Sequence, residues 1–360
     1  MTPRRRHLVR VLAVGAAVAV LTAGAVSAPA LARPDHGYAR LDLVSDRPGH
    51  ARLTDPNLVN PWGLALGPTS PLWVANNHTG TATVYRGATR GVPAAALPLV
   101  VTIPGGSPTG EVFQQTRNFT VHGPNGSGPA VVLFASETGH LTGWSPAASD
   151  TAASDAVTDA DAVYKGLAIV SPHGTVLLAA PDFHAGHVDL YDTAFHPVAR
   201  RGRFTDPAMP RGYAPFNVYN SGDRVYVAYA QQDADHHDEV AGPGKGFVDA
   251  YSADGALLRR VVSRGPLNAP WGMTIAPEGF GRFAGALLVG NFGDGRINAF
   301  DQSTGRLLGT LRNGRGAPVV IDGLWALQPG NAVAGGADAV WFSAGPDDEA
   351  HGLLGLLRAS

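Results

Sequence analysis

One short phrase recurs along the chain and constrains its fold more than any other feature. The clearest copies are Asn60–Leu66 (NPWGLAL) and Ala269–Ile275 (APWGMTI). Each is followed by an apolar segment ending on Asn, then a Gly turn, then a third segment ending on an aromatic residue. A period of about 50 residues built from short strands is typical of a blade array, and long helical periodicity is absent. The sequence therefore predicts an all-β protein, a six-bladed β-propeller.

The repeat allows an inner strand to be assigned in each of six blades. These are expected at Pro61–Gly67, Asn118–His122, Gly166–Val170, Pro215–Asn220, Pro270–Ala276 and Gly323–Gln328. The fourth strands of blades 2 and 3 are weak, and we place them near Ala162–Tyr164 and near Arg203.

The sixth blade runs out of sequence before its fourth strand. A spare strand-like segment, Tyr38–Val44, lies near the other end of the chain. Pairing it with Gly352–Leu357 completes the blade and closes the ring, which removes two free sheet edges. We therefore expect residues 33–360 to form a single domain in which residues 38–44 close blade 6.

The first 32 residues have the features of a secretory signal peptide. Arg4, Arg5, Arg6 and Arg10 precede a largely apolar stretch, and Ala30-Leu31-Ala32 is a small-residue cleavage site. The arginine pair also resembles a twin-arginine export signal. We expect a secreted protein with no transmembrane segment after the leader is removed; the competing interpretation is an uncleaved membrane anchor.

Charge and cysteine content exclude several classes of function. Without the leader the chain has 23 basic and 29 acidic residues, a formal net charge of −6 with His neutral. This mildly acidic balance gives no electrostatic footprint for nucleic acid. The chain has no cysteine, so thiol catalysis and cysteine metal sites are excluded.

The recurring phrase also has a mechanical interpretation. An inner strand faces a crowded axis, so a small residue such as Gly63 or Gly272 fits there. The neighbouring aromatics, Trp62 and Trp271, carry large apolar areas suited to packing between sheets. We interpret both tryptophans as packing residues.

The strand pattern resembles the NHL-type repeat and the wider group of six-bladed propellers that includes the gluconolactonase and SMP-30 type lactonases. The segment Leu53–Ala65 (LTDPNLVNPWGLA) more closely resembles the start of a secreted bacterial propeller family with no assigned activity. This resemblance covers nearly the whole chain after the leader. It implies the architecture and leaves the reaction open.

Polar residues gather where the loops of a propeller open on one face, around the mouth of the central channel. We predict a ligand rim there, made of Asn60, Asn76, Asn77, Asn118 and Asp182. Its partner would be a small molecule, a glycan or a protein. The competing interpretation is that the Asn residues cap exposed turns, which Asn does well.

The resemblance to the lactonases implies a divalent cation, calcium first of all, at this mouth. Those enzymes hold it with a Glu, Asn, Asn, Asp set, which Glu137, Asn217, Asn268 and Asp322 approximate here. Carboxylate and amide oxygens are the ligands that calcium takes.

Histidines offer a second kind of chemistry at the same rim. His184 and His236 lie in loops of different blades, and neutral imidazole acts as a metal ligand or general base. We name these two as candidate catalytic residues. Three functions stay open: a binding propeller, a metal-dependent hydrolase or lyase of lactonase type, and a structural propeller of the cell envelope.

Overall fold

The computed structural model describes residues 37–360 except 115 and 200. The chain divides into two units, Met1–Asp35 and His36–Ser360, and the described residues all lie in the second. The signal-peptide prediction for residues 1–32 falls outside the described residues.

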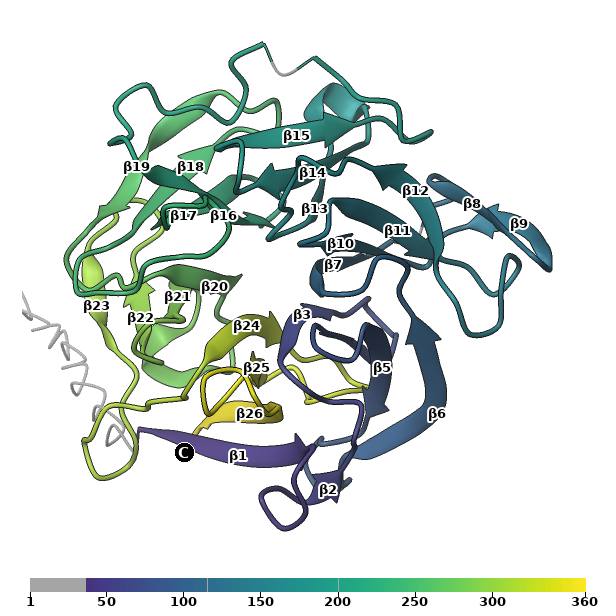
Figure 1. Ribbon diagram of the computed structural model, residues 1–360. Coiled ribbons are helices and arrows are strands. Elements are labelled where there is room, and N and C mark those ends of the chain that lie inside the picture. The colour runs from purple at the N-terminus through teal and green to yellow at the C-terminus, as the bar shows by residue number, and fades with distance from the viewer. Residues whose placement is uncertain (1–36, 115, 200) are drawn as a thin grey trace, which may run out of the picture. The chain divides into compact units, whose positions relative to one another are not determined.

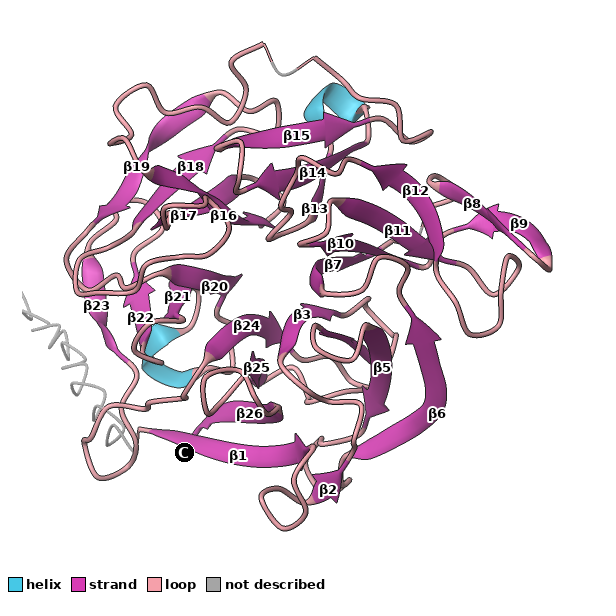
Figure 2. Cartoon of the chain, in the orientation of Figure 1, coloured by secondary structure: helices cyan, strands magenta, loops and turns pink. Residues whose placement is uncertain are grey.

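Six sheets stand around a central axis and form a six-bladed β-propeller, as predicted (Figure 1). Blades 1, 4 and 5 have four antiparallel strands each, and from the axis outward they are β3 (Pro61–Ala65), β4 (Leu72–Asn76), β5 (Thr81–Arg86) and β6 (Ala95–Thr102); β16 (Tyr213–Asn220), β17 (Val225–Gln231), β18 (Phe247–Tyr251) and β19 (Leu257–Ser263); and β20 (Pro270–Ile275), β21 (Leu287–Asn291), β22 (Ile297–Phe300) and β23 (Leu307–Thr310). Figure 2 shows how strands dominate the described residues, whose only helices are the short 3-10 segments η1 (Pro172–Gly174) and η2 (Gly281–Phe283).

The sixth blade is completed by the start of the described chain. Its strands are β24 (Leu324–Pro329), β25 (Ala339–Ala344), β26 (Leu353–Ala359) and β1 (Tyr38–Ser45), with the short β2 (Leu53–Thr54) beyond. Strand β1 pairs antiparallel with β26, from Tyr38 opposite Ala359 to Ser45 opposite Leu353. The predicted closure is thus confirmed.

Blade 2 departs from the prediction in both its inner and its outer strand. Its strands are β7 (Pro108–Phe113), β10 (Val132–Ser136), β11 (His140–Trp144) and β12 (Ser154–Thr158). The segment predicted as the inner strand, Asn118–His122, instead begins a hairpin of β8 (Thr120–Gly123) and β9 (Gly126–Pro129) inserted between β7 and β10. The inner strand escaped notice because Thr109 and Glu111 interrupt its apolar pattern.

Blade 3 has three strands, β13 (Ala168–Val170), β14 (Leu177–Asp182) and β15 (His187–Tyr191). No strand forms near Arg203, and only a single bridge between Tyr191 and Pro197 extends the sheet outward. The residues predicted as the fourth strand of blade 2, Ala162–Tyr164, lead into blade 3, where Tyr164 bridges Asp182.

Neighbouring inner strands approach closely enough to exclude side chains. A Cβ on Gly63 would lie 2.5 Å from the carbonyl oxygen of Thr109, and one on Gly272 would lie 2.4 Å from that of Trp325. These glycines therefore let the inner strands of adjacent blades pack backbone to backbone, as the repeat predicted.

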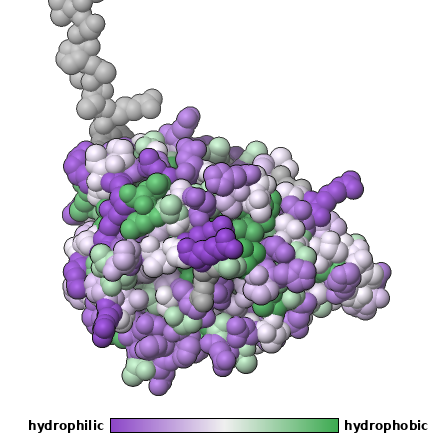
Figure 3. Space-filling model, turned by 90° about the horizontal axis from the view of Figure 1, so that it is seen from above, coloured by the Kyte–Doolittle hydropathy of each residue, from purple (hydrophilic) through white to green (hydrophobic). Residues whose placement is uncertain are grey.

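Six hydrophobic clusters lie between the blades, one for each neighbouring pair. The surface seen in Figure 3 mixes hydrophilic and hydrophobic residues. Among the exposed large apolar side chains are two pairs on outer strands, Leu257 with Leu258 and Leu307 with Leu308. No helix of the described chain is long and apolar enough to cross a membrane.

Candidate functional site

A layer of aromatic rings fills the channel just inside the mouth. Trp325 stacks on Trp62 with ring centroids 3.5 Å apart and on Phe292 at 4.1 Å, and Trp271 meets its edge at 5.8 Å. Trp62, Trp271 and Trp325 occupy the same position of the repeat in blades 1, 5 and 6. The two tryptophans predicted to pack between sheets thus also meet one another, across the axis.

Blade 3 places a lysine at that aromatic position. The side chain of Lys165 has no exposed area, and its Nζ donates to Glu137 Oε1 and, over 3.1 Å, to Asp238 Oδ1. The same Nζ lies 5.1 Å from the centre of the Trp62 ring, a cation–π contact. Burial lowers the pKa of Lys165, but Glu137, Glu239 and Asp238 outweigh that effect and raise it above its usual value. Lys165 is therefore charged.

More carboxyl groups surround this ammonium than it can neutralise. Burial raises the pKa of Glu239 to about 8, although Lys165 opposes the rise. Glu349 accepts a 2.5 Å hydrogen bond from Asn60 Nδ2, yet burial and the nearby Glu137 carboxylate raise its pKa too. The mouth is an acidic site with a deficit of positive charge.

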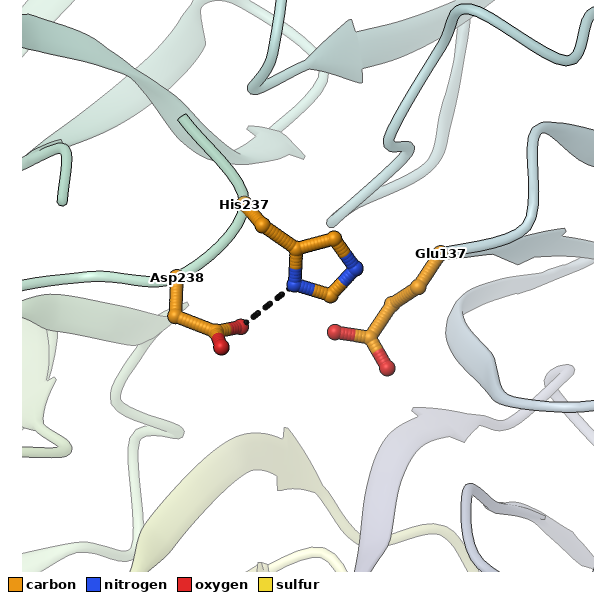
Figure 4. Close-up of side chains that lie close together, drawn as sticks. All are labelled: Glu137, His237 and Asp238. Atoms are coloured by element: carbon orange, nitrogen blue, oxygen red, sulfur yellow. Dashed lines mark hydrogen bonds and ion pairs between the residues drawn. The ribbon is translucent and has the colours of Figure 1, made fainter. Parts of the chain in front are cut away.

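Three side chains of the mouth have the spacing of a metal site. Ligand atoms of Glu137, His237 and Asp238 all lie within 4.8 Å of one another. Figure 4 shows the carboxylates of Glu137 and Asp238 near the imidazole of His237, whose Nδ1 lies 2.9 Å from Asp238 Oδ1. Glu137 follows β10, and the other two come from the long loop between β17 and β18.

The second group with such spacing is Asp182, His187 and Asp189 in blade 3. Asp182 is buried and accepts the backbone N–H groups of Val163 (3.2 Å) and Ala185 (3.1 Å). Burial nevertheless raises its pKa. With two backbone donors on one oxygen, Asp182 holds the turn after β14 in place.

The structure brings part of the predicted ligand rim together. Asn60 accepts from Trp325 Nε1 over 3.0 Å while donating to Glu349. Asn77 donates to Glu137 Oε2 over 2.8 Å. Asn76 is buried and donates to Thr81 and Thr83 within its own blade.

Asn118 lies elsewhere. Because the inner strand of blade 2 is β7, Asn118 follows that strand instead of preceding it, and its carbonyl oxygen accepts from Gln114 Nε2. It therefore sits toward the end of the blade opposite Glu137, and its assignment to the rim is wrong.

The residues matched to the lactonase cation set are used individually. Asn217 donates to the carbonyl of Trp271 and accepts from the N–H of Val218, and Asn268 accepts from the N–H of Gly242. Asp322 is exposed and accepts from the N–H of Asp347. All four members are described, and no hydrogen bond or ion pair joins any two of them; the calcium set stays a prediction.

The two candidate catalytic histidines do meet. The rings of His184 and His236 have centroids 5.8 Å apart, and both residues are exposed. His236 precedes the metal-group member His237 directly, so the pair borders the acidic mouth. A catalytic role for them stays a prediction.

Sequence reasoning overlooked Glu239, Glu349 and Glu111. The first two were hidden because only the fold brings their loops beside Lys165. Glu111 carried a visible signal: Pro108-Thr109-Gly110-Glu111 repeats the pattern Pro-x-Gly-apolar with a carboxylate at the apolar position.

Comparison with known proteins gives relatives of unknown role. The chain is 34% identical over 324 residues to the uncharacterized protein R648 of Acanthamoeba polyphaga mimivirus, a match covering 88% of this chain and 78% of R648. It is also 34% identical over 330 residues to the uncharacterized protein L690 of the same virus, covering 88% of this chain and 84% of L690. No protein-family model matches the chain.

Solved structures resemble the chain in architecture. A streptogramin B lyase structure covers 90% of this chain and 97% of its own at 10% identity, with a TM-score of 0.49. A gluconolactonase from Xanthomonas campestris covers 68% of this chain and 87% of its own at 15% identity, with a TM-score of 0.40. At such identities the likeness is one of fold alone.

Proposed function

This chain belongs to the same family as the mimivirus proteins R648 and L690, and we propose that it is a binding propeller whose mouth holds a divalent metal ion. The ligands are Glu137, His237 and Asp238, and their mutual spacing within 4.8 Å is the observation that carries the proposal. Because an imidazole joins two carboxylates, the set suits Mn²⁺ or Zn²⁺ better than Ca²⁺, which takes oxygen ligands.

The charge balance of the mouth supports a cation. Glu137, Asp238, Glu239 and Glu349 share the single ammonium of Lys165. A divalent ion supplies the missing positive charge, and it displaces the protons that crowding keeps on Glu239 and Glu349. Metal binding then releases protons, as it does wherever ligands or their neighbours must ionise.

The ion also gives the mouth a way to bind a ligand. Three protein ligands leave coordination positions open, as in metal sites that accept water or substrate. Oxygen donors of a small molecule or glycan fit those positions, because the aromatic layer below closes the channel behind them.

A second candidate function is metal-dependent hydrolysis of the lactonase type. The observation that favours it is the contact between His184 and His236, 5.8 Å apart beside the metal group. A neutral imidazole there serves as a general base toward metal-bound water. Hydrolysis of δ-gluconolactone by manganese-loaded protein, abolished in His236→Ala, supports this candidate; equal rates in the two proteins reject it.

The proposal is tested by titrating chelator-treated protein with Mn²⁺, Zn²⁺ and Ca²⁺ in a calorimeter. We expect one site per chain, with Mn²⁺ or Zn²⁺ bound more tightly than Ca²⁺. Glu137→Gln and His237→Ala each lower the affinity by about tenfold or more, since each removes a ligand of a three-residue set. Ion binding also raises Tm in wild-type protein.

Matched controls come from the same loop. Asp235→Asn and His236→Asn alter exposed residues of the same types that lie outside the metal group, and both should bind metal as wild type does. No saturable binding at millimolar metal, or an affinity that Glu137→Gln and His237→Ala leave unchanged, would reject the metal site.

We also propose that the protein is exported, on the strength of the leader-like residues 1–32. Expression in a bacterial host with a C-terminal tag should yield protein outside the cytoplasm, beginning after Ala32. Protein that stays in the cytoplasm with an intact N-terminus would count against export.

A further inference from the structure

Beyond the aromatic layer, toward the opposite face of the propeller, the channel widens into a cavity of about 520 Å³. All six blades contribute to its wall, each through the later part of its inner strand. The wall includes apolar side chains such as Leu64, Leu167, Val218, Met273 and Leu327. Its size falls within the range of small-molecule sites.

One carboxyl group lines this cavity. Glu111 on β7 occupies the repeat position at which the other five blades carry the apolar residues just named. Its side chain is 7% exposed, and neither carboxyl oxygen has a hydrogen-bond partner. An unpartnered buried carboxyl opposes folding, so packing alone gives no reason for glutamate at this position.

The neighbouring polar side chains are already committed. Gln114 donates to the carbonyls of Asn118 and Ala130 and accepts from Thr116. Asn217 bonds Trp271 and Val218 as described above. Asn220 donates to the carbonyl of Ile169 and accepts from Gly222, and Tyr219 accepts from Ile275. Glu111 is thus the polar group of this wall that awaits a partner.

We propose that the channel cavity is a second binding site, for a small organic amine whose ammonium pairs with Glu111 and whose apolar body packs against the surrounding inner strands. This site is separate from the metal site of the mouth. The aromatic layer of Trp62, Trp271 and Trp325 lies between the two.

The chemistry of the wall selects an amine over other ligands. A metal ion needs several charged or carbonyl ligands, and this wall offers one carboxylate. An anion finds no cation among the lining residues. An ammonium needs a single opposite charge, and in this buried setting the ion pair gains strength because water is largely excluded. Burial raises the pKa of Glu111 well above its usual range, which is the state that a bound cation relieves.

Two probes of equal shape test the site: 4-phenylbutylamine and 4-phenyl-1-butanol. Calorimetry and the fluorescence of Trp271, which lines the cavity, report binding. We expect saturable one-to-one binding of the amine, at least tenfold tighter than that of the alcohol. Glu111→Gln removes this preference and leaves the two probes equal. Glu111→Met, which restores the residue type of the other blades, does the same.

The controls separate this site from the mouth. Glu278→Gln changes an exposed glutamate elsewhere and keeps amine binding. Glu137→Gln and His237→Ala, which abolish the proposed metal site, also keep it, so either proposal fails alone. Equal binding of amine and alcohol by wild type, amine binding that survives both Glu111 variants, or no saturable amine binding at millimolar concentration would each overturn the proposal.

Discussion

Lys165 and Glu137 form an ion pair that joins blades 2 and 3 at the mouth of the propeller. The lysine side chain is fully buried and the glutamate side chain is 14% exposed. Glu137 also accepts from Asn77 of blade 1, so its carboxylate ties three blades together. The mouth is therefore a structural junction as well as a candidate site.

Removing the ammonium should destabilise this junction strongly. Lys165→Met leaves Glu137 and Asp238 without their partner, and breaking a buried pair costs about 3–5 kcal/mol of unfolding free energy. Urea unfolding at pH 7 measures the loss. The double variant Lys165→Met/Glu137→Gln should recover part of it, whereas Lys245→Met, at the chain's other lysine, should change little. Additive losses in the double variant would contradict the coupling.

Glu111 should make stability depend on pH. Its folded pKa lies well above the usual 4.5, so the folded protein keeps a proton that the unfolded chain releases. The free energy of unfolding then falls as pH rises from about 4.5 to the folded pKa, by up to about 1.4 kcal/mol per pH unit. Glu111→Gln lacks this slope, so its stability relative to wild type should grow between pH 5 and 8.

Urea unfolding at several pH values measures this difference. Glu239 and Asp249, whose pKa values are raised to about 8 and about 7, act equally in both proteins and cancel. Parallel curves for wild type and Glu111→Gln would show that Glu111 does not titrate as its burial requires.

Arg260 should matter more at high pH than at low pH. Its guanidinium contacts Asp206 and, over 3.2 Å, the fully buried Asp249. Burial raises the pKa of Asp249 to about 7, and Arg260 limits the rise. Arg260→Met should cost about 3 kcal/mol at pH 8, where Asp249 must ionise unpaired, and less at pH 5, where Asp249 holds a proton.

The neighbouring Arg259 provides the control, since it donates to the carbonyl of Gln302. Arg259→Met should show a smaller loss that does not change between the two pH values. An equal loss for Arg260→Met at pH 5 and pH 8 would mean that Asp249 is not the group concerned.

Ring closure by β1 should be essential to stability. Leu43 of β1 is 3% exposed and belongs to the cluster between blades 6 and 1. Leu43→Ala should cost about 3 kcal/mol, as for other large-to-small changes in a core. Val92→Ala, at a residue 53% exposed, should cost little. A loss below 1 kcal/mol in Leu43→Ala would show that β1 contributes little to the closed ring.

The inner-strand prediction succeeded where the repeat was regular and failed where it was not. Pro270–Ile275 formed close to its predicted bounds because every apolar position of the phrase is filled. In blade 2 the true inner strand carries Thr109 and Glu111 at such positions, and the nearby apolar pattern of Phe119 and Val121 drew the assignment to a hairpin instead.

The candidate site was predictable only as a region. Loop order along a propeller indicated that Asn77 and Glu137 face one mouth, and they are hydrogen-bonded. Pairing within that mouth depends on side-chain reach across three or more loops, which no local pattern encodes. Glu349 is 289 residues from Asn60 in sequence, yet the two are joined by a hydrogen bond.

The sequence by itself determined the architecture, because each blade meets the same crowded axis and repeats the same answer: glycine where inner strands touch, an aromatic residue beside it, and a spare strand to close the ring. Only the tertiary structure decided which exceptions to the repeat matter. Lys165 replaces an aromatic residue and Glu111 an apolar one, and their significance depends on burial and on the charges that other blades bring within reach. Those quantities exist only once the ring is closed.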